Sequence, residues 1–437
     1  MWENFLQVQP LEIAQKAVAL RDHFARQGIG EHSTIGVASK APLETIVTLF
    51  SLWSLNATTW LCPLREPASK LVQLSRHIRA DLIVGTRELL CGNNAQAEQL
   101  LADVKHSCGK TLINTSGSTG QPKFVQHDVS QHFLSAEGVN LAMNFDASSN
   151  WLLSLPVYHV GGLAIAIRAA LSGGSITMLS ADERVEDVIM NENVTHISLV
   201  AAQLRKWIER PELVAKMQRA TRIVLGGGPV PLWFSQVCQR HALPVVASYG
   251  ATEMASTWTA TLPVMPAQAG IQSINNSGKL LPSRELKLSE EGEILVRGPM
   301  LFRGYAASDL GPFDSDGFYR TSDIGRLDDD ENLVVLGRKD NMFISGGENI
   351  HPQEIELSLL AHPRVEAARV IAVPSEKWGK RPVAYVRMKD QEQIRENDLK
   401  EHLKKSLPSF KIPDQFLGWT NDIRDKADAL ASNRRAP

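Results

Sequence analysis

The sequence contains few cysteines, and none of them are closely spaced. Four cysteines occur among 437 residues, and no two of them form a Cys-x-x-Cys pair. Closely spaced pairs are typical of structural zinc sites, and many cysteines are typical of small disulfide-bonded secreted domains. The cysteine content argues against both classes and favours a chain that works in the reducing cytoplasm.

Long hydrophobic runs are also missing. A membrane-spanning helix needs about 20 mostly apolar residues. The best candidate, residues 152–171, is interrupted by Ser154, Pro156, His159 and Arg168. The first ten residues lack the basic start and the apolar core of an export signal. We therefore expect no membrane span, no cleaved leader and a cytoplasmic location.

Neither sign of charge is in excess. The chain has 46 basic and 48 acidic side chains, for a net charge of -2. This balance provides no general attraction for nucleic acid or anionic lipid, so any polyanion must be bound at a local site. We expect small-molecule partners and no nucleic acid. The length of 437 residues predicts two to four domains at roughly 100–200 residues each.

Helix and strand patterns alternate over the first two-thirds of the chain. Residues 10–27 and 42–55 carry apolar side chains in helical patterns. Short β-branched runs occupy residues 34–38, 81–84, 175–178, 196–200, 222–225 and 244–247, with helical stretches at 203–207 and 231–241. This alternation predicts parallel sheets covered by helices, which is an α/β architecture.

The pattern changes after about residue 280. Residues 285–288 and 293–297 alternate as antiparallel strands do, and residues 332–336 form another strand. Further on, helices are expected at 352–360 and 396–407 and strands at 367–373 and 382–387. The predicted fold class is therefore α/β, with helix-covered mixed or parallel sheets and a β-rich subdomain, followed by a small α+β domain. The predicted division is a large domain at 1–337, a linker at 338–340 and a small domain at 341–437.

The sharpest motif is a loop rich in glycine and hydroxyl residues at 115–123. Its glycines let backbone N–H groups converge on an anion, and its hydroxyls and lysine add donors for phosphate oxygens. The alternative is a polar surface loop, but the loop closes with Pro-Lys between two apolar runs, which favours phosphate binding. No Walker A signature is present. The candidate phosphate-binding residues are Thr115, Ser116, Gly117, Ser118, Thr119, Gly120 and Lys123.

Two constellations follow predicted strands, where ligand sites of α/β proteins gather. Thr252 and Glu253 offer a hydroxyl and a carboxylate for phosphate and Mg²⁺, although alone such a pair is typical of a helix N-cap and its first turn. A run of three glycines would let a flat ligand approach the backbone, with a tight turn as the alternative. It consists of Gly226, Gly227 and Gly228.

Two further constellations each have an ordinary structural alternative. His159 lies beside Tyr158 in an apolar stretch, where a lone histidine is usually structural. Asp323 and Arg338 offer a carboxylate and a guanidinium for ribose hydroxyls, but alone their segments would be surface turns.

Taken in order, these motifs resemble those of the adenylate-forming acyl- and aryl-CoA synthetase superfamily, the AMP-binding enzymes. The similarity extends from about residue 10 to about 415 and rests on the segments TSGSTGQPK, PVYH, GGGPV, YGATE, YRTSD and GRKDNMFISGGENIHPQEIE. The resemblance implies a carboxylic acid, ATP, Mg²⁺ and coenzyme A as ligands. It also implies that an acyl-adenylate forms first and a CoA thioester second, with rotation of a mobile C-terminal domain between the steps.

The resemblance implies roles for individual residues. The loop at 115–123 would hold the β- and γ-phosphates, and Thr252 and Glu253 would be catalytic, with Glu253 as the metal ligand. The adenine and ribose sites would include Gly226, Gly227, Gly228, Tyr249, Gly250, Asp323 and Arg338. The catalytic His159 would line or gate the acid pocket, and Asp340 would be the hinge. The residues facing coenzyme A would be Ser345, Gly346 and Gly347.

Within the superfamily, the sequence is most similar to the o-succinylbenzoate–CoA ligase family of menaquinone synthesis. This similarity lies in residues 151–160, 198–204 and 252–257. The substrate of that family has a second carboxylate that needs a cation. Arg168 stands where these ligases carry a basic residue, and Ser198 is assigned to the same acid-binding site; an exposed helix charge is the alternative for Arg168. A ligase for another aryl or medium-chain acid stays open.

One family feature is missing near the C-terminus. Relatives carry a catalytic lysine in a Gly-Lys context beyond a Lys-x-Pro element, but here no Gly-Lys follows Lys411. Lys426 is the candidate replacement. Without such a lysine, adenylation would be weak, because its charge stabilises the phosphate transition state. The chain would then be a catalytically weak homologue kept for binding. Association into a homo-oligomer and the role of residues 263–277 are left open.

Overall fold

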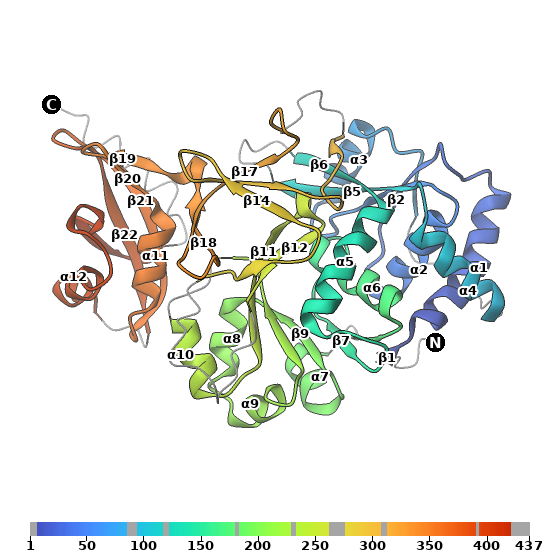
Figure 1. The fold of residues 1–437 in the computed structure, drawn as a ribbon, viewed down its shortest axis with the longest axis horizontal. Helices are drawn as coiled ribbons and strands as arrows, with labels where there is room; N and C mark the ends of the chain where they lie inside the picture. Colours follow the sequence, from blue (N-terminus) through green and yellow to red (C-terminus); the bar gives the residue numbers. More distant parts are fainter. Residues whose placement is uncertain are drawn as a thin grey trace.

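The computed structural model describes residues 7–84, 94–116, 122–179, 183–228, 233–261, 276–306, 313–389 and 393–420. Figure 1 shows a large part that contains the N-terminal helices and a small lobe, in orange and red, at the other end of the long axis. Strand β18 leads from the large part into the small lobe.

The first sheet of the large part has six strands in the order β16-β6-β5-β3-β2-β4. Strands β4, β2, β3 and β5 run parallel, whereas β5 and β6 form an antiparallel hairpin. The bounds are β2 Thr34–Val37, β3 Thr58–Leu61, β4 Leu82–Val84, β5 Lys110–Ser116, β6 Pro122–Asp128 and β16 Gly304–Tyr305. The predicted phosphate loop is therefore the tip of a β-hairpin, and its residues 117–121 lie outside the described ranges.

The second sheet has eight strands in the order β1-β8-β7-β9-β10-β11-β12-β13, with β8 to β11 parallel. The bounds are β1 Gln7–Val8, β7 Asn150–Leu153, β8 Ser175–Met178, β9 His196–Leu199, β10 Arg222–Leu225, β11 Val245–Ala251, β12 Ser256–Ala260 and β13 Lys279–Leu280. Successive side chains of a strand point to opposite faces. Val224 accordingly enters one core while Ile223 and Leu225 enter another, so both faces of the sheet are buried.

Helices fill the space between the two sheets and cover their outer faces. Helices α1, α2, α5 and α6 share one apolar core with residues of both sheets and therefore lie between them. Helices α7 to α10 cover the opposite face of the eight-stranded sheet. The bounds are α1 Pro10–Arg26, α2 Pro42–Trp53, α3 Ala68–His77, α4 Asn94–Lys105, α5 Val129–Met143, α6 Val160–Ser172, α7 Val185–Asn191, α8 Ala201–Trp207, α9 Pro211–Met217 and α10 Trp233–Arg240.

The β-rich subdomain is a third sheet of four antiparallel strands, in the order β14-β15-β17-β18. The bounds are β14 Glu285–Leu288, β15 Glu293–Arg297, β17 Tyr319–Leu327 and β18 Leu333–Arg338. Its apolar side packs against residues of β6, of β12 and of the turn before β12. The alternative of a surface turn at 319–323 is excluded, because these residues begin strand β17.

The small lobe has its own core, formed by residues between 343 and 416. It contains β19 Phe343–Ser345, β20 Glu348–Ile350, α11 Pro352–Leu360, β21 Val365–Ser375, β22 Gly379–Met388, α12 Glu396–Lys404 and β23 Gln415–Gly418. Arg205 of α8 donates to the carbonyl oxygen of Val365 at 2.5 Å, which joins the lobe to the large part. The predicted fold class is confirmed, including the β-rich subdomain and the α+β end.

The structure was also searched for transmembrane helices. Over the described ranges, no helix is both long and apolar enough to cross a membrane.

Candidate functional site

Three residues predicted for the adenine and ribose sites meet where the eight-stranded and four-stranded sheets adjoin. Tyr249 on β11 donates its hydroxyl hydrogen to Oδ2 of Asp323 on β17 at 2.7 Å. Arg338 is the antiparallel partner of Asp323, and its Nη1 lies 3.3 Å from Oδ1 of that carboxylate. Strands from two sheets thus place a carboxylate, a phenol and a guanidinium in one group that can bind hydroxyls.

Burial controls the protonation of this group. Desolvation raises the pKa of the Tyr249 hydroxyl well above its ordinary value, and the charge of Asp323 adds to the shift. Tyr249 therefore remains a hydrogen-bond donor at neutral pH. Burial also raises the pKa of Asp323, against the opposing effect of its bonds from Tyr249 and Arg338.

The glycines near this group have two different reasons to be glycine. Gly227 has a φ of +78°, and a Cβ on Gly228 would meet nothing within 4 Å, so this turn is open to a flat ligand. A Cβ on Gly250 would lie 1.7 Å from the carbonyl oxygen of Ser256. Gly250 therefore has a packing reason, the close approach of β12. In the turn at 226–228, a Cβ on Gly226 would lie 3.2 Å from Oγ of Ser248, so the open space is at Gly228.

Glu253 lies in a short 3-10 turn, Thr252–Met254, between β11 and β12. Thr252 and Glu253 do not start an α-helix, so the alternative of a helix N-cap and its first turn does not apply to them. The hydroxyl of Tyr305 donates to Oε1 of Glu253 at 2.8 Å, and Nζ of Lys123 lies 4.9 Å from the centre of the same tyrosine ring. The lysine of the phosphate hairpin and the carboxylate of the turn thus contact one side chain.

The phosphate hairpin is described only in part. Thr115 and Lys123 are register partners at the ends of β5 and β6, so the loop between them leaves the sheet at one point. Outside the described ranges lie Gly117, Ser118, Thr119 and Gly120. The backbone of Ser116 ends β5, and its side chain is not described.

The side chains around Glu253 fit Mg²⁺ only as a site that ATP helps to complete. No cluster of three or more metal-ligating side chains occurs in the described part of the chain. Mg²⁺ in nucleotide sites is held by one or two carboxylates together with phosphates and water, so a single Glu253 suffices when ATP supplies the other ligands.

Arg168 on α6 is the centre of a second group, which includes residues predicted to bind the acid. Its side chain is buried, and its Nη2 donates to the hydroxyls of Ser256 and Thr257 at 3.2 and 3.3 Å. The guanidinium lies 4.9 Å from the ring of Trp151, whose Nε1 donates to Oγ of Ser198 at 3.0 Å. The alternative of an exposed helix charge is therefore excluded.

The electrostatics of Arg168 are unusual for a buried side chain. Its Nε is buried and has no hydrogen-bond partner among the residues that the structure describes. Burial, with a smaller effect of Arg284, lowers the pKa of Arg168 to about 9, so the group still carries its charge at neutral pH. Within the described ranges, no carboxylate forms an ion pair with it. The site thus contains an uncompensated positive charge.

His159 does not join this group. It is an exposed residue immediately before α6, with its ring 4.5 Å from that of Tyr158. Although the residue is exposed as a whole, partial desolvation of its ring, together with the charge of Arg65, lowers the pKa of His159. Nine residues along the helix separate it from Arg168, which is about 13 Å of rise. The structure therefore separates two of the three predicted acid-site residues, with His159 at the start of α6 and Arg168 near its other end.

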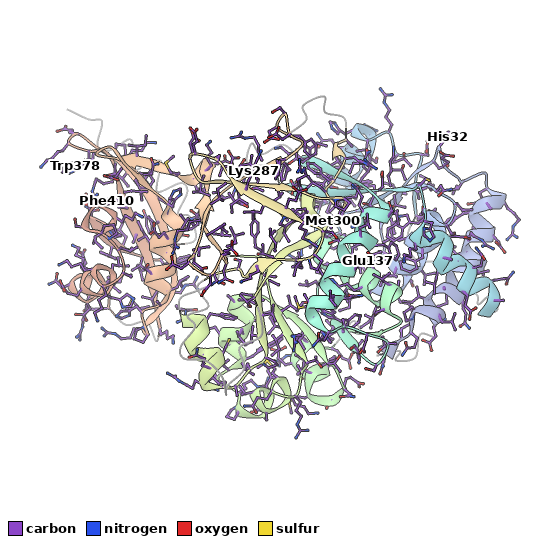
Figure 2. The ribbon with its side chains drawn as sticks, viewed as in Figure 1. His32, Glu137, Lys287, Met300, Trp378 and Phe410 are labelled. Atoms are coloured by element: carbon purple, nitrogen blue, oxygen red, sulfur yellow. The ribbon has the colours of Figure 1, made fainter. Side chains whose placement is uncertain are left out.

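The residues predicted to face coenzyme A lie in the small lobe. Gly346 and Gly347 have φ values of +60° and +90°, and the N–H of Gly346 donates to the carbonyl of Trp378. Ser345 is buried beside Arg381. Figure 2 shows Trp378 at the outer end of the lobe, far from Met300 in the core beneath the nucleotide residues. In this orientation the lobe does not bring these residues to the nucleotide site.

Two more predictions concern the linker and the C-terminus. The Asp340 carboxylate accepts a hydrogen bond from Nη2 of Arg338 at 3.2 Å, within the turn Lys339–Asn341. Lys426 lies outside the described ranges, as do residues 262–275, most of the stretch whose role was left open.

Sequence reasoning missed two tyrosines of the site. The hydroxyls of Tyr305 and Tyr319 lie 3.3 Å apart beside Glu253. The chain has only five tyrosines, and three of them, Tyr249, Tyr305 and Tyr319, lie in this site. Their scarcity was a usable signal, because a rare residue type near successive motifs points to a shared location.

Comparisons with known proteins identify the family of this chain. Residues 110–306 match the AMP-binding enzyme family, and residues 354–424 match the AMP-binding enzyme C-terminal domain. The 2-succinylbenzoate–CoA ligase of Geobacillus kaustophilus is 30% identical over 430 residues, which cover 92% of this chain and 87% of that protein. The chain belongs to the AMP-binding enzyme family.

Other relatives of this AMP-binding enzyme carry similar names. The 2-succinylbenzoate–CoA ligase of Bacillus licheniformis is 36% identical over 70% of this chain, a match that spans 65% of the relative's length. The o-succinylbenzoate CoA synthetase of Bacillus subtilis, in complex with the acyl-adenylate intermediate, superimposes with a TM-score of 0.77 at 25% identity. That match covers 97% of this chain and 92% of the solved one.

Proposed function

We propose that this AMP-binding enzyme is an acid–CoA ligase that activates o-succinylbenzoate with ATP and passes the acyl group to coenzyme A. The observation that carries the choice of acid is Arg168. A buried charge without a counter-ion is costly, and a ligand carboxylate would neutralise it. The acid named for the relatives has two carboxylates, so one can react while the other binds the guanidinium. Ser198 is linked to Arg168 by Trp151, which donates to the serine hydroxyl and packs against the guanidinium.

In the first step, an oxygen of the reacting carboxylate attacks the α-phosphorus of ATP, and the bond to pyrophosphate breaks. The chain contributes position and charge, as in other phosphoryl and nucleotidyl transfers. Tyr249, Asp323 and Arg338 orient the ribose, and the open turn at 226–228 accepts the adenine. The hairpin loop, with Lys123, neutralises the β- and γ-phosphates, while Thr252 adds a hydroxyl beside them.

Glu253 would hold Mg²⁺ through the carboxylate oxygen that Tyr305 leaves free. When bound, the ion supplies charge neutralisation to the phosphates. One solved relative, the o-succinylbenzoate CoA synthetase of Bacillus subtilis, is in complex with ATP and a magnesium ion. It is 26% identical to this chain and superimposes with a TM-score of 0.75.

In the second step, the sulfur of coenzyme A attacks the acyl carbonyl, and AMP leaves. For this step we propose a large domain at 1–337, a hinge at 338–340 with Asp340, and a mobile domain at 341–437. The separate core of the lobe supports this division, as does the turn that follows β18. Because Ser345, Gly346 and Gly347 face away here, rotation about the hinge would bring them over the adenylate.

The choice of acid is tested by pyrophosphate release. o-Succinylbenzoate should support turnover with ATP and Mg²⁺, and coenzyme A should convert the product to a thioester. Benzoate is the matched control, because it has the reacting carboxylate and lacks the second one. Equal turnover with benzoate or with a medium-chain fatty acid would overturn the assignment of the acid.

We propose Lys426 as the cation of the adenylation step, on the basis of its position beyond Lys411. Lys426→Ala should then slow pyrophosphate release and leave thioester formation from supplied acyl-adenylate unchanged. Lys404→Ala, which removes an exposed lysine of α12, is the control. An unchanged adenylation rate in Lys426→Ala would remove this residue from the mechanism. A wild-type chain that binds ATP without adenylating any acid would instead be a homologue kept for binding.

A further inference from the structure

The charges of the phosphate side are arranged around Tyr305. Lys123 and Glu253 have opposite charges, and both contact this one tyrosine, the lysine through the ring and the carboxylate through the hydroxyl. In the part of the chain that the structure describes, Lys123 and Glu253 form no ion pair with each other. Each charge instead contacts a different part of the Tyr305 side chain.

Strand pairing explains why Tyr305 occupies this place. Strand β16 adds to the edge of the hairpin, where Tyr305 is the register partner of Val125 on β6, two residues after Lys123. The N–H of Phe302 donates to the carbonyl oxygen of Glu253 at 2.9 Å, which attaches the segment before β16 to the 3-10 turn. The segment is therefore bound to the hairpin at one end and to the turn at the other.

The tyrosine is itself held in one orientation. Its hydroxyl lies 3.3 Å from that of Tyr319, and its ring packs against Phe302 at a centroid distance of 5.1 Å. Burial and the charge of Glu253 raise the pKa of the Tyr305 hydroxyl, so it remains a donor at neutral pH. A cation over an aromatic face and a hydrogen bond to a carboxylate are both favourable in a half-buried place.

We propose that Tyr305 is a positioning residue that keeps Lys123 and Glu253 apart and separately available, the first for the β- and γ-phosphates and the second for Mg²⁺. This inference rests on the proposed function, because it assigns the two charges to MgATP. Without the tyrosine, the two side chains would neutralise each other, and MgATP would have to break that ion pair in order to bind. Tyr305 acts through its two neighbours and takes no part in bond making.

Two variants separate the two contacts. Tyr305→Phe keeps the ring under Lys123 and removes the hydroxyl from Glu253, whereas Tyr305→Leu removes both contacts. ATP binding is measured by calorimetry across a Mg²⁺ titration, and pyrophosphate release gives KM and kcat. Tyr385→Phe is the matched control, because Tyr385 is a buried tyrosine in the core sheet of the small lobe.

The expected result is a change in Mg²⁺ dependence. Tyr305→Phe should need roughly tenfold more Mg²⁺ for half-maximal ATP binding, because Glu253, without the hydroxyl that holds it, would be drawn into an ion pair with Lys123 that Mg²⁺ has to break. Tyr305→Leu should weaken ATP binding more than Tyr305→Phe does. Its KM for MgATP should rise further, and its kcat should change less than its KM. Thioester formation from supplied acyl-adenylate should stay at the wild-type rate in both, since that step uses neither the phosphates nor the metal.

The possible failures are distinguishable. If the wild-type chain binds no MgATP, the proposed function fails before the variants are compared. If the wild-type chain binds MgATP and Tyr305→Phe needs the same or less Mg²⁺, the positioning role is overturned. Equal losses in adenylation and in thioester formation would also overturn it, because they would indicate a general folding defect.

Discussion

The nucleotide side and the acid side of the site differ in how their charges are balanced. On the nucleotide side, Asp323 has Tyr249 and Arg338, and Glu253 has Tyr305, so each carboxylate already has a partner. On the acid side, Arg168 has two hydroxyls and an aromatic face but no carboxylate within the described ranges. In the proposed function, the nucleotide side is organised before ATP arrives, whereas the acid side is completed by the charge of its ligand.

The largest effect is expected from pH, and it should act on both sides together. His132 supports the phosphate hairpin through Thr111, and His196 packs against Trp151 on the acid side. Burial lowers the pKa of each histidine to about 4. Below about pH 6.5, the unfolded chain takes up protons that the folded chain does not.

The free energy of unfolding should therefore fall between about pH 6.5 and pH 4, by roughly 1.4 kcal/mol per pH unit for each histidine. Above pH 7 both states hold the same neutral imidazoles, and this contribution disappears. Urea unfolding from pH 8 to pH 4.5 measures the slope. A constant free energy of unfolding between pH 6.5 and pH 5 would show that these histidines are not buried in the neutral form.

The next largest effect should come from removing the unbalanced cation. Arg168→Met should lower kcat/KM for a dicarboxylate acid by roughly 100-fold, because the second carboxylate loses its partner. The KM for ATP should not change. Thermal stability without ligand should stay the same or rise, since an unpaired buried charge has been removed.

Arg284→Met is the matched control for this substitution. Arg284 is also a buried arginine, but its guanidinium donates to the carbonyls of Thr257, Pro282 and Ser135. Its loss should lower thermal stability, because those carbonyls lose their donors. If Arg168→Met destabilises the protein as much as Arg284→Met does, the acid side is balanced by structure rather than by ligand.

A smaller effect, confined to the other side, is expected from Asp323→Asn. The amide keeps the shape but weakens the bonds to Tyr249 and Arg338, so the KM for ATP should rise roughly 10- to 30-fold. The KM for the acid should stay near its wild-type value. Steady-state kinetics with each substrate varied in turn checks this, and a parallel rise in both constants would contradict the separation of the two sides.

The smallest effect should come from Tyr249→Phe. This change removes one donor to Asp323 and keeps the ring, so the KM for ATP should rise by roughly threefold to tenfold. Arg338 continues to hold the carboxylate. An effect larger than that of Asp323→Asn would mean that the phenol itself contacts the nucleotide more strongly than the carboxylate does.

Much of the fold could be predicted from local patterns. The β-branched runs at 222–225 and 175–178 match β10 and β8 at both ends. Strand β10 contains the continuous apolar segment Ile-Val-Leu, which is typical of a strand that is buried on both faces. The hairpin β5–β6 was not predicted, although its tip was predicted to be a phosphate-binding loop. Glycine and hydroxyl residues identify what a loop can bind, whereas the pairing of the strands beside it depends on contacts with the rest of the sheet.

The burial of Arg168 had a signal that periodicity reasoning did not use. The helix Val160–Ser172 is apolar on nearly all sides, and such helices are buried. A single arginine within it has no face directed to solvent, so the exposed alternative was physically unfavourable. The contact of Tyr305 with Glu253 had no comparable local signal, because 52 residues separate them along the chain.

The order of the motifs and their residue types was enough to identify the family, the α/β class and the candidate ligands. These features are encoded locally, since backbone freedom, hydrophobic period and side-chain chemistry act over a few residues. Only the tertiary structure decided which charges meet, that Tyr305 stands between Lys123 and Glu253, and that no described carboxylate is a counter-ion of Arg168. Those facts depend on strand register and on the packing of helices between sheets, where residues far apart in the chain acquire a common environment.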